Sequence, residues 1–234
     1  MQNTRVKSSE RTLVLLELFA SKQRAMTITD ISKGMDMPQS STSMLVRSLV
    51  SLGYLSHDPK ARTYYPTMRV TLLGTWLKRR HYTNERIPNL LSEIAARTGE
   101  STLLAMRNGI YAQYVMTQNG ADPLRLHVES GQLRPLACSA VGWALMLYDS
   151  DREIGKIIRK TKAEAGRSRW VRTADDAFEQ VKLTQQRGYA FSNSSSVRGA
   201  GAIAILLPAS TDTAPLAAAV GGPIERIEQK RDLI

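Results

Sequence analysis

Residues 26–55 constrain the fold most, because their helix-start and helix-stop signals indicate two short helices separated by a very tight turn. Thr27 and Asp30 have the spacing of an N-cap and a first-turn acid, whose side chains satisfy free backbone N–H groups at the start of a helix. Gly34 would end this first helix. Pro38 suits the start of the second helix, because a residue in that position needs no N–H donor.

The second helix of this stretch is predicted to have one buried apolar side and one exposed polar side. Leu45, Leu49 and Leu52 recur at helical spacing and mark the buried side. Two short helices joined so closely form a helix-turn-helix, the unit that lays its second helix in the major groove of DNA. An ordinary helical hairpin with a solvated polar face would show the same pattern, so this stretch alone favours neither interpretation.

The segment that follows favours DNA binding. Residues 54–57 and 63–65 alternate like two strands, and the turn between them is basic. A hairpin with cations at its tip, directly after such a helix, is typical of a wing, where Lys60 and Arg62 would meet the sugar-phosphate backbone. An ordinary surface hairpin would explain the alternation but not its position. The sequence therefore predicts a winged helix-turn-helix domain over residues 1–68.

The candidate DNA-binding residues lie on the polar side of the second helix and on the wing. Hydroxyl groups near the helix N-terminus suit phosphates, together with free backbone N–H groups. Gln39 and Ser43 suit base edges, and Met44 suits the methyl group of thymine. The predicted set consists of Gln39, Ser40, Ser41, Thr42, Ser43, Met44, Arg47, Lys60 and Arg62.

The distribution of charge supports the same interpretation. The chain has 234 residues and a formal net charge of +11. Residues 1–80 hold 13 Lys or Arg and 5 Asp or Glu, which leaves +8, whereas the remaining residues hold 19 and 16, which leaves +3. A basic protein can also bind an anionic membrane or an acidic protein. The excess lies on the predicted winged helix, however, and this location favours nucleic acid.

Composition argues against several other classes of protein. No segment approaches the unbroken apolar run of a transmembrane helix, and the polar N-terminus does not resemble a signal peptide, so no membrane association is expected. The single cysteine, Cys138, precludes an intrachain disulfide, so a cytoplasmic location is expected. His57, His81 and His127 lack the spacing of metal ligands, and we expect neither a metal nor another cofactor.

Beyond residue 68 the pattern predicts a linker helix over residues 69–82 and a second domain over residues 83–234. Strand-like runs and amphipathic helices are mixed in this domain, which is typical of an α+β fold with helices packed against a sheet. Small residues over 137–142 would permit close approach of a ligand or a neighbouring helix. The predicted strands span residues 102–106, 111–116, 124–130, 189–191, 202–208 and 216–220, and helices are expected over residues 85–97, from about 139, and over 151–162 and 174–186.

The order of these motifs resembles the IclR family of bacterial transcriptional regulators over nearly the whole chain. Any one of the motifs is a weak signal, but all of them in order are specific. The matching segments are Met37-Pro38-Gln39-Ser40-Ser41, Gly53-Tyr54-Leu55, Asp58-Pro59, Thr98-Gly99-Glu100-Ser101, residues 131–144, Arg187-Gly188-Tyr189 and Gly222-Pro223-Ile224-Glu225-Arg226-Ile227.

The resemblance implies an N-terminal winged helix, a linker helix and a C-terminal effector-binding domain that is shaped like a GAF or PAS sensor with a central antiparallel sheet. Members of the family dimerise through the N-terminal region, often pair into tetramers and bind palindromic operators. Their effectors include small organic acids and aromatic compounds. We therefore expect a homodimer or homotetramer that binds double-stranded operator DNA, responds to a small-molecule effector and controls catabolic genes.

The resemblance also implies the lining of an effector pocket. The matched residues are Leu126, Ala140, Val141, Ser192, Ala202, Ala219 and Gly221. The frequent Lys and His of the family are replaced by Trp143 and Ala137, so most groups that would hold a small hydrophilic acid are missing. A larger, flatter or more apolar ligand such as an aromatic acid is favoured, with Arg198 or Arg125 as partner of its carboxylate. Alternatively, these small residues only close-pack the core.

Three functions are compared. The leading hypothesis is a ligand-responsive, DNA-binding regulator without catalytic activity. The rival is a hydrolase-like enzyme fused to a DNA-binding domain, with Ser139 beside Cys138 as the nucleophile. A nucleophile needs a base within reach, and His127 is the only histidine of the second domain, which disfavours this rival. The third is a dimerising scaffold that binds no ligand.

Overall fold

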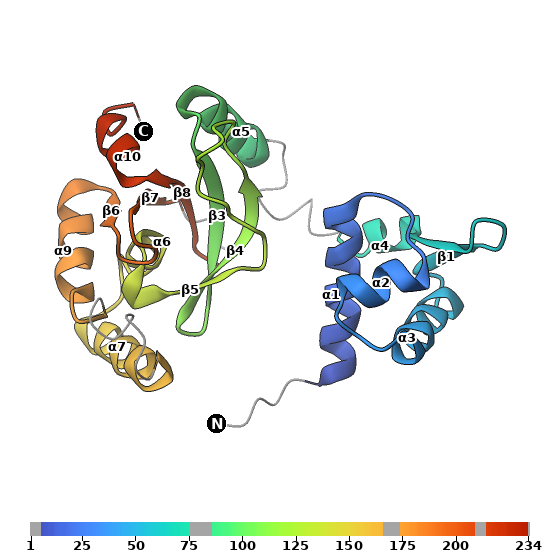
Figure 1. Ribbon diagram of the computed structural model, residues 1–234. Coiled ribbons are helices and arrows are strands. Elements are labelled where there is room, and N and C mark those ends of the chain that lie inside the picture. The colour runs from blue at the N-terminus through green and yellow to red at the C-terminus, as the bar shows by residue number, and fades with distance from the viewer. Residues whose placement is uncertain (1–5, 75–85, 166–173, 209–213, 234) are drawn as a thin grey trace. The chain divides into compact units, whose positions relative to one another are not determined.

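Tertiary contacts divide the chain into two units, residues 1–80 and residues 81–234. The computed structural model describes residues 6–74, 86–165, 174–208 and 214–233, and Figure 1 shows the elements within them. Each unit has its own hydrophobic core. The predicted linker helix over residues 69–82 lies largely outside the described residues.

The N-terminal unit is a helix-turn-helix followed by a two-stranded antiparallel hairpin and a short helix. Its core is formed by apolar side chains from the first three helices and the first strand. The bounds are α1 (Lys7–Lys22), α2 (Ile28–Gly34), α3 (Gln39–Ser51), β1 (Leu55–Asp58), β2 (Thr63–Pro66) and α4 (Met68–Leu72). The expected winged helix is therefore present.

The start of α2 has the predicted capping arrangement. The Thr27 hydroxyl accepts a hydrogen bond from the Asp30 backbone N–H at 3.2 Å, and the Asp30 carboxylate accepts one from the Thr27 backbone N–H at 3.1 Å. The bond from the Thr27 backbone N–H, followed by one that the Thr27 hydroxyl donates to the same carboxylate at 3.0 Å, holds the pKa of the Asp30 carboxyl below its usual value. The two partners satisfy N–H groups that the first helical turn leaves free.

The buried side of α3 differs from the predicted stripe. Leu49 is buried, but Leu52 is 56% exposed, and the buried positions are Thr42, Val46 and Leu49. These three are also four and three residues apart, so helical spacing alone does not distinguish the two stripes. The core of the N-terminal unit selects the one that includes Val46.

The C-terminal unit contains an antiparallel sheet of six strands in the described residues, in the order β5-β4-β3-β8-β7-β6. The expected α+β domain with a central antiparallel sheet is confirmed. The strand bounds are β3 (Ser101–Asn108), β4 (Tyr111–Gln118), β5 (Leu133–Pro135), β6 (Ala190–Asn193), β7 (Ala200–Leu206) and β8 (Leu216–Pro223).

The strand predicted over residues 124–130 is wrong, because this segment pairs with no strand. Some of its backbone groups bond to side chains instead: the Leu126 carbonyl accepts a hydrogen bond from the Ser101 hydroxyl at 2.7 Å, and the Val128 N–H donates to the Asn119 side chain at 3.4 Å. The edge of the sheet beside β4 is occupied by β5. The segment over residues 124–130 is therefore an irregular connection with alternating apolar residues.

Helices cover both faces of this sheet, as Figure 1 shows. One face packs against α6, α7 and α9 in the largest apolar cluster, and the other packs against α5 and α10 in two smaller clusters. The bounds are α5 (Arg86–Thr98), α6 (Ala140–Leu145), α7 (Asp151–Ala165), α9 (Ala177–Arg187) and α10 (Ile224–Gln229), with a 3₁₀ turn η2 (Leu136–Cys138) before α6. None of the helices described is long and apolar enough to cross a membrane.

The run of small residues before α6 is explained by backbone packing. A Cβ atom at Gly142 would lie 2.1 Å from the carbonyl oxygen of Leu136, so the first turn of α6 rests directly on η2. The Trp143 indole N–H donates to the Ala137 carbonyl at 3.0 Å and stabilises the same contact between α6 and η2. Of the two predicted reasons for small residues here, close approach of a neighbouring helix is the one observed for Gly142.

This contact makes Gly142 intolerant of a side chain. We expect Gly142→Ala to destabilise the protein by about 1–3 kcal/mol, because the added methyl group meets backbone and neither partner can move aside. Gly155→Ala in α7 is the matched control, since its Cβ would lie 3.4 Å from the mobile end of Arg159. Urea denaturation followed by circular dichroism compares the two variants, and equal unfolding free energies would contradict the packing described.

Candidate functional site

The exposed face of α3 is polar in its N-terminal half. Gln39, Ser40 and Arg47 are exposed, Met44 is 74% exposed, and Ser41 and Ser43 are half-buried. The Gln39 side-chain amide donates to the Thr29 hydroxyl at 3.3 Å, which orients it from α2. Apart from Thr42, the helix residues predicted to contact DNA thus lie together on an accessible surface.

Thr42 does not belong to this surface. Its side chain is fully buried, and its hydroxyl donates to the Pro38 carbonyl at 3.0 Å in the first turn of α3. The prediction that Thr42 contacts DNA is therefore wrong, because the hydroxyl stabilises the helix itself. Its spacing to Val46 and Leu49, four and seven residues on, was the signal that could have identified it as buried.

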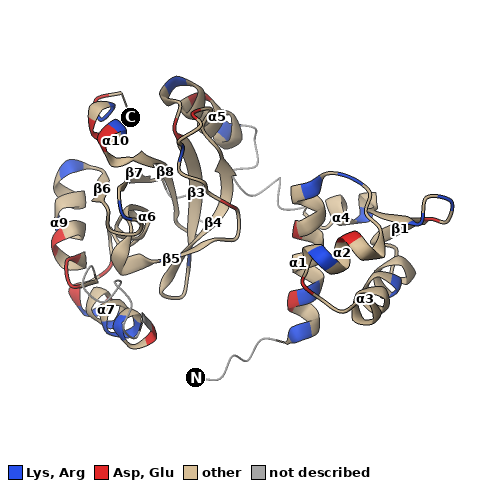
Figure 2. Ribbon diagram, viewed as in Figure 1, with Lys and Arg blue, Asp and Glu red and all other residues tan. Residues whose placement is uncertain are grey.

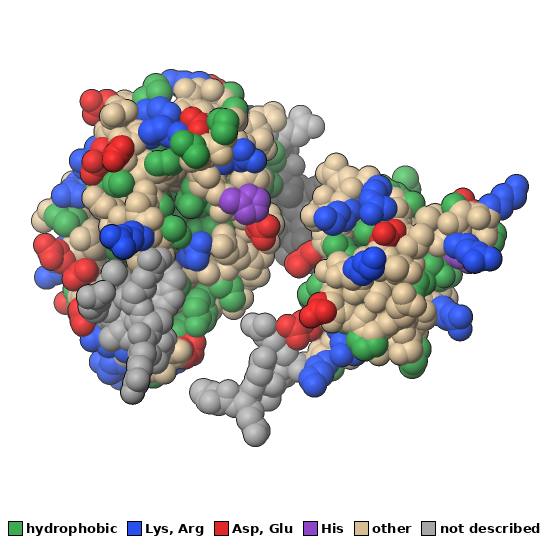
Figure 3. All heavy atoms as spheres, viewed as in Figure 1, with side chains coloured by type: hydrophobic (Ala, Val, Ile, Leu, Met, Phe, Trp, Pro, Cys, Tyr) green, Lys and Arg blue, Asp and Glu red, His purple; other side chains and the backbone are tan. Residues whose placement is uncertain are grey.

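The hairpin of β1 and β2 presents both predicted cations at its tip, as Figure 2 shows. The Asp58 carboxylate accepts hydrogen bonds from the backbone N–H groups of Lys60 at 2.8 Å and Ala61 at 3.2 Å, which folds the turn. The Lys60 and Arg62 side chains are exposed. In the space-filling view of Figure 3 the cations of this tip project from the surface of the unit.

The C-terminal end of α3 is fixed by residues that the sequence did not reveal. The Arg69 guanidinium donates to the Leu52 carbonyl at 3.0 Å and lies 4.8 Å from the centre of the Tyr54 ring. The Thr67 hydroxyl donates to the Gly53 carbonyl at 2.6 Å. Cationic and hydroxyl donors satisfy carbonyl groups that a helix end leaves free. The beginning of α4 is therefore held against the end of α3.

The C-terminal unit contains a cavity between the sheet and the beginning of α6. About 500 Å³ in it and at its mouth is not filled by protein atoms, and part of this space is open to solvent. Small and apolar side chains form most of its lining. All seven predicted pocket residues lie on it, namely Leu126, Ala140, Val141, Ser192, Ala202, Ala219 and Gly221. That they bind an effector stays a prediction.

Arg134 and Tyr114 give this cavity a polar part that the sequence analysis missed. Burial raises the pKa of the Tyr114 hydroxyl, and the positive charge of the nearby Arg134 guanidinium opposes part of that shift. Arg134 is the one cation among the described lining residues. Arg125 and Arg198, the predicted carboxylate partners, are exposed and do not line the cavity. Arg134 lies on β5, and its position opposite Ala112 on β4 depends on a strand pairing that periodicity does not reveal.

The polar groups near Ser139 serve the local structure. Its hydroxyl donates to the Pro135 carbonyl at 3.0 Å and accepts from the Gly142 N–H at 3.2 Å, which caps α6. Among the described residues that line the cavity none is a histidine, and His127 lies on the surface beside Glu129. The described parts of the chain also hold no group of three or more potential metal ligands. The cavity therefore offers Ser139 no histidine base, the partner that an activated serine nucleophile would need.

Comparison with known families identifies both units. A family model described as "IclR helix-turn-helix domain" matches residues 8–59, and one described as "Bacterial transcriptional regulator IclR C-terminal" matches residues 79–233.

Curated relatives are named as regulators of transcription, not as enzymes. The HTH-type transcriptional regulator XynR of Escherichia coli K12 is 22% identical over 200 residues, which cover 86% of this chain and 79% of the relative. The glycerol operon regulatory protein of Streptomyces coelicolor is 25% identical over 232 residues, which cover 97% and 89%.

Solved structures share the fold. An IclR homologue from Microbacterium hydrocarbonoxydans, complexed with 4-hydroxybenzoate, superposes with a TM-score of 0.64 at 17% identity, covering 96% of this chain and 95% of that one. The effector domain of a regulator from Acinetobacter sp. ADP1 is 30% identical, with a TM-score of 0.56 and coverage of 65% and 88%.

Proposed function

Because the chain belongs to the IclR family of bacterial transcriptional regulators, we propose that it binds a palindromic operator as a dimer and responds to an aromatic acid. It is a ligand-responsive regulator with a helix-turn-helix DNA-binding domain, and it is not an enzyme. In this proposal residues 1–68 bind DNA, residues 69–82 form the linker and residues 83–234 bind the effector, in the cytoplasm. Catabolic genes are the expected targets.

The proposed DNA contacts divide into two kinds. Arg47, Lys60 and Arg62 are exposed cations on α3 and the wing, and they would pair with phosphates together with the hydroxyls of Ser40 and Ser41. Gln39, Ser43 and Met44 would meet base edges in the major groove. The observation that carries this assignment is the accessible polar surface of α3 directly beside a wing with cations at its tip.

The double variant Arg47→Ala with Arg62→Ala tests the phosphate contacts. We expect weaker binding to a promoter fragment from the protein's own locus, measured by fluorescence anisotropy over a range of salt concentrations. Because each lost phosphate contact removes about 0.9 from the slope of log K against log salt, and the dimer would lose two contacts from each protomer, the slope should become less steep by about 3.6. Arg152→Ala with Arg187→Ala removes two exposed arginines of the C-terminal unit as a control. An unchanged slope and affinity in the first variant would refute the assignment.

Exposed apolar side chains in the N-terminal unit support the proposed dimer. Met68, Leu72 and Leu73, on and directly after the short helix α4, are 76%, 56% and 53% exposed. Single exposed apolar residues are common, but a group of large ones on so short a segment is typical of a contact surface. Two winged helices joined there could read the two halves of a palindrome.

Replacing Leu72 and Leu73 with Glu should weaken self-association. We expect the dissociation constant of the dimer to rise at least tenfold, about 1.4 kcal/mol, because two charges would enter an apolar contact. Sedimentation velocity measures the assembly, and operator affinity should fall with it. Tyr148→Glu, at an 86% exposed position of the C-terminal unit, is the control. An assembly state that the double variant leaves unaltered would exclude this surface.

The cavity chemistry supports an aromatic acid as the effector. A flat ring fits against the small side chains of Ala140, Ala202 and Ala219, and Arg134 can pair with a carboxylate. The relative that is complexed with 4-hydroxybenzoate points to the same class of ligand. The effector would change DNA binding by favouring one arrangement of the two winged helices over another.

Arg134→Met tests this role with 4-hydroxybenzoate as the probe. We expect the dissociation constant measured by titration calorimetry to rise about 10- to 100-fold, since a hydrogen bond to a charged group contributes about 1.5–3 kcal/mol. Arg198→Met removes an exposed arginine outside the cavity and should leave the constant unchanged. A larger effect from this control than from Arg134→Met would return the role to Arg198, one of the two arginines predicted from sequence.

A further inference from the structure

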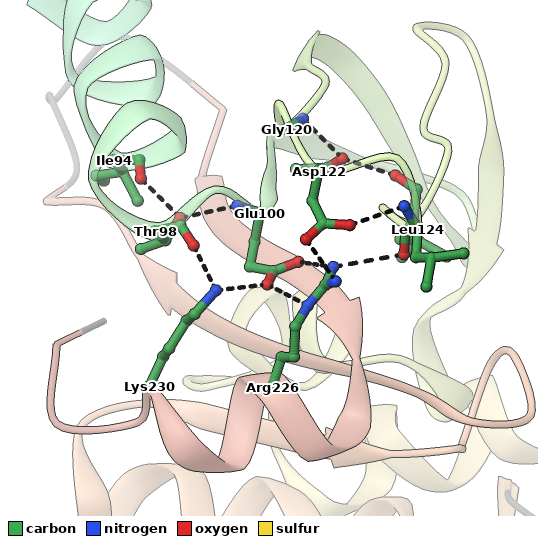
Figure 4. Close-up of polar contacts among 10 residues, drawn as sticks. Ile94, Thr98, Glu100, Gly120, Asp122, Leu124, Arg226 and Lys230 are labelled. Carbon is green, nitrogen blue, oxygen red and sulfur yellow. Dashed lines mark hydrogen bonds and ion pairs between the residues drawn. The ribbon is translucent and has the colours of Figure 1, made fainter.

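A buried carboxylate lies beside the cavity of the C-terminal unit. The Glu100 side chain is 0% exposed and is paired with two cations, Arg226 on α10 and Lys230 directly after it, as Figure 4 shows. The Arg226 Nε and Nη2 atoms lie 2.7 Å and 2.9 Å from its two oxygens, and the Lys230 Nζ atom lies 2.8 Å from Oε1. A buried charge is very costly unless it is paired, so α10 is held at this position.

Arg226 extends this cluster to a second segment. Its Nη1 atom lies 2.8 Å from the Asp122 carboxylate, and its Nη2 atom donates to the Leu124 carbonyl at 3.4 Å. The other oxygen of Asp122 accepts from the Leu124 N–H at 2.7 Å, which shapes the turn locally. One guanidinium therefore joins the buried carboxylate directly before β3 to the turn around residue 122.

The same segment continues into the wall of the cavity. Leu126 and Val128 line the cavity, and a Leu126 methyl carbon would lie 3.2 Å from a Cβ atom at the neighbouring lining residue Gly221. The Ser101 hydroxyl accepts from the Gly120 N–H at 3.1 Å and donates to the Leu126 carbonyl at 2.7 Å. Residues 120–128, which we call the wall segment, form no strand. They are held by these polar contacts, by the buried Val128 and by Leu126, which packs against the largest apolar cluster.

The cluster also reaches α5. Lys230 donates to the carbonyl of Thr98, the last residue of α5, at 2.6 Å. The Thr98 hydroxyl in turn donates to the Ile94 carbonyl at 2.7 Å. Since α5 is the first described helix of the C-terminal unit, the same cluster contacts the helix that leads back toward the linker and the wall segment that closes the cavity.

We propose that Arg226 is a positioning residue for the effector cavity, because its bond to Asp122 holds the wall segment against the bound ligand. A segment whose backbone is not paired in the sheet opens locally at lower cost than the strands beside it, and a contact of this kind raises that cost. A bound effector would pack on Leu126, and the Arg226–Asp122 pair holds the turn beside it. Both therefore order the same nine residues of the wall segment. This inference rests on the proposed effector binding. Of its two tests below, only the second requires a ligand, whereas the first is made on the protein alone.

The first test follows hydrogen exchange in the full chain without any ligand. Asp122→Asn removes the charge that faces Arg226 but keeps an acceptor for the Leu124 N–H, so the turn itself persists. We expect amides of the wall segment to exchange about tenfold faster, while β3 and α5 exchange as before. Glu129→Gln is the control, because that carboxylate pairs only with His127 among the contacts described and ties the segment to no other element. Unchanged exchange over residues 120–128 in Asp122→Asn would overturn the proposal.

The second test measures the affinity for 4-hydroxybenzoate by titration calorimetry. We expect a five- to tenfold weaker affinity for Asp122→Asn and no change for Glu129→Gln. Lys230→Met removes a cation from Glu100 without touching the wall segment, so it should lower the melting temperature and leave the affinity unchanged. Equal loss of affinity in Lys230→Met and Asp122→Asn would indicate a purely structural role for the cluster and overturn the proposal.

Arg226→Lys separates charge from geometry, because one ammonium group cannot reproduce the forked contacts to Glu100 and Asp122. It should show the fast exchange of Asp122→Asn, and wild-type exchange would contradict the proposal. If the wild-type protein binds no 4-hydroxybenzoate, the proposed effector class fails, and the exchange measurements alone decide the role of Arg226.

Discussion

The buried charge of Glu100 dictates how the C-terminal unit is closed. A carboxylate without water requires cations, and the two that pair with it come from α10 and the residue directly after it, 126 and 130 residues further along the chain. Gly222 leaves room for this carboxylate, since a Cβ atom there would lie 2.2 Å from a Glu100 oxygen. The last helix is therefore packed against the start of β3 and the end of β8. The cavity lies directly beside this closure, because Gly221 and Leu126 line it.

The N-terminal unit satisfies its helix ends in a comparable way. The Thr27–Asp30 pair caps the start of α2, and Arg69 and Thr67 bind the last carbonyls around the end of α3. The Thr42 hydroxyl also bonds to a backbone carbonyl of its own helix and is therefore unavailable to DNA. The surface left for DNA recognition consists of side chains that the packing and hydrogen bonds of the fold do not fully occupy. This division explains why α3 can present many hydroxyl groups and still be a stable helix.

Local patterns predicted much of this structure because they report local physics. The capping spacing, the glycines at helix ends and the alternating strands fixed the winged helix and most of the sheet. The pocket lining came from the family resemblance, and its seven residues do meet at one cavity. Alternation misled the prediction for residues 124–130, because irregular backbone that follows the rim of a cavity can also alternate. Arg134, Arg69 and the partners of Glu100 were missed since their contacts join elements distant in sequence.

Two explanations were open for the small residues of the C-terminal unit, close packing of the core and room for a ligand. Each explanation applies to some of these residues. Gly142 has no side chain because the backbone of η2 occupies that space, so it serves packing. Gly221 lines the cavity, and a Cβ atom there would come closest to the flexible end of Leu126, at 3.2 Å. Ala202 and Ala219 lie on the same lining and leave room that larger residues would fill. In the proposed binding mode such a cavity contacts the effector mainly through shape, with one cation to recognise an acid. Its selectivity must then depend on how firmly its irregular wall is held, and this gives the remote Arg226 a role in binding.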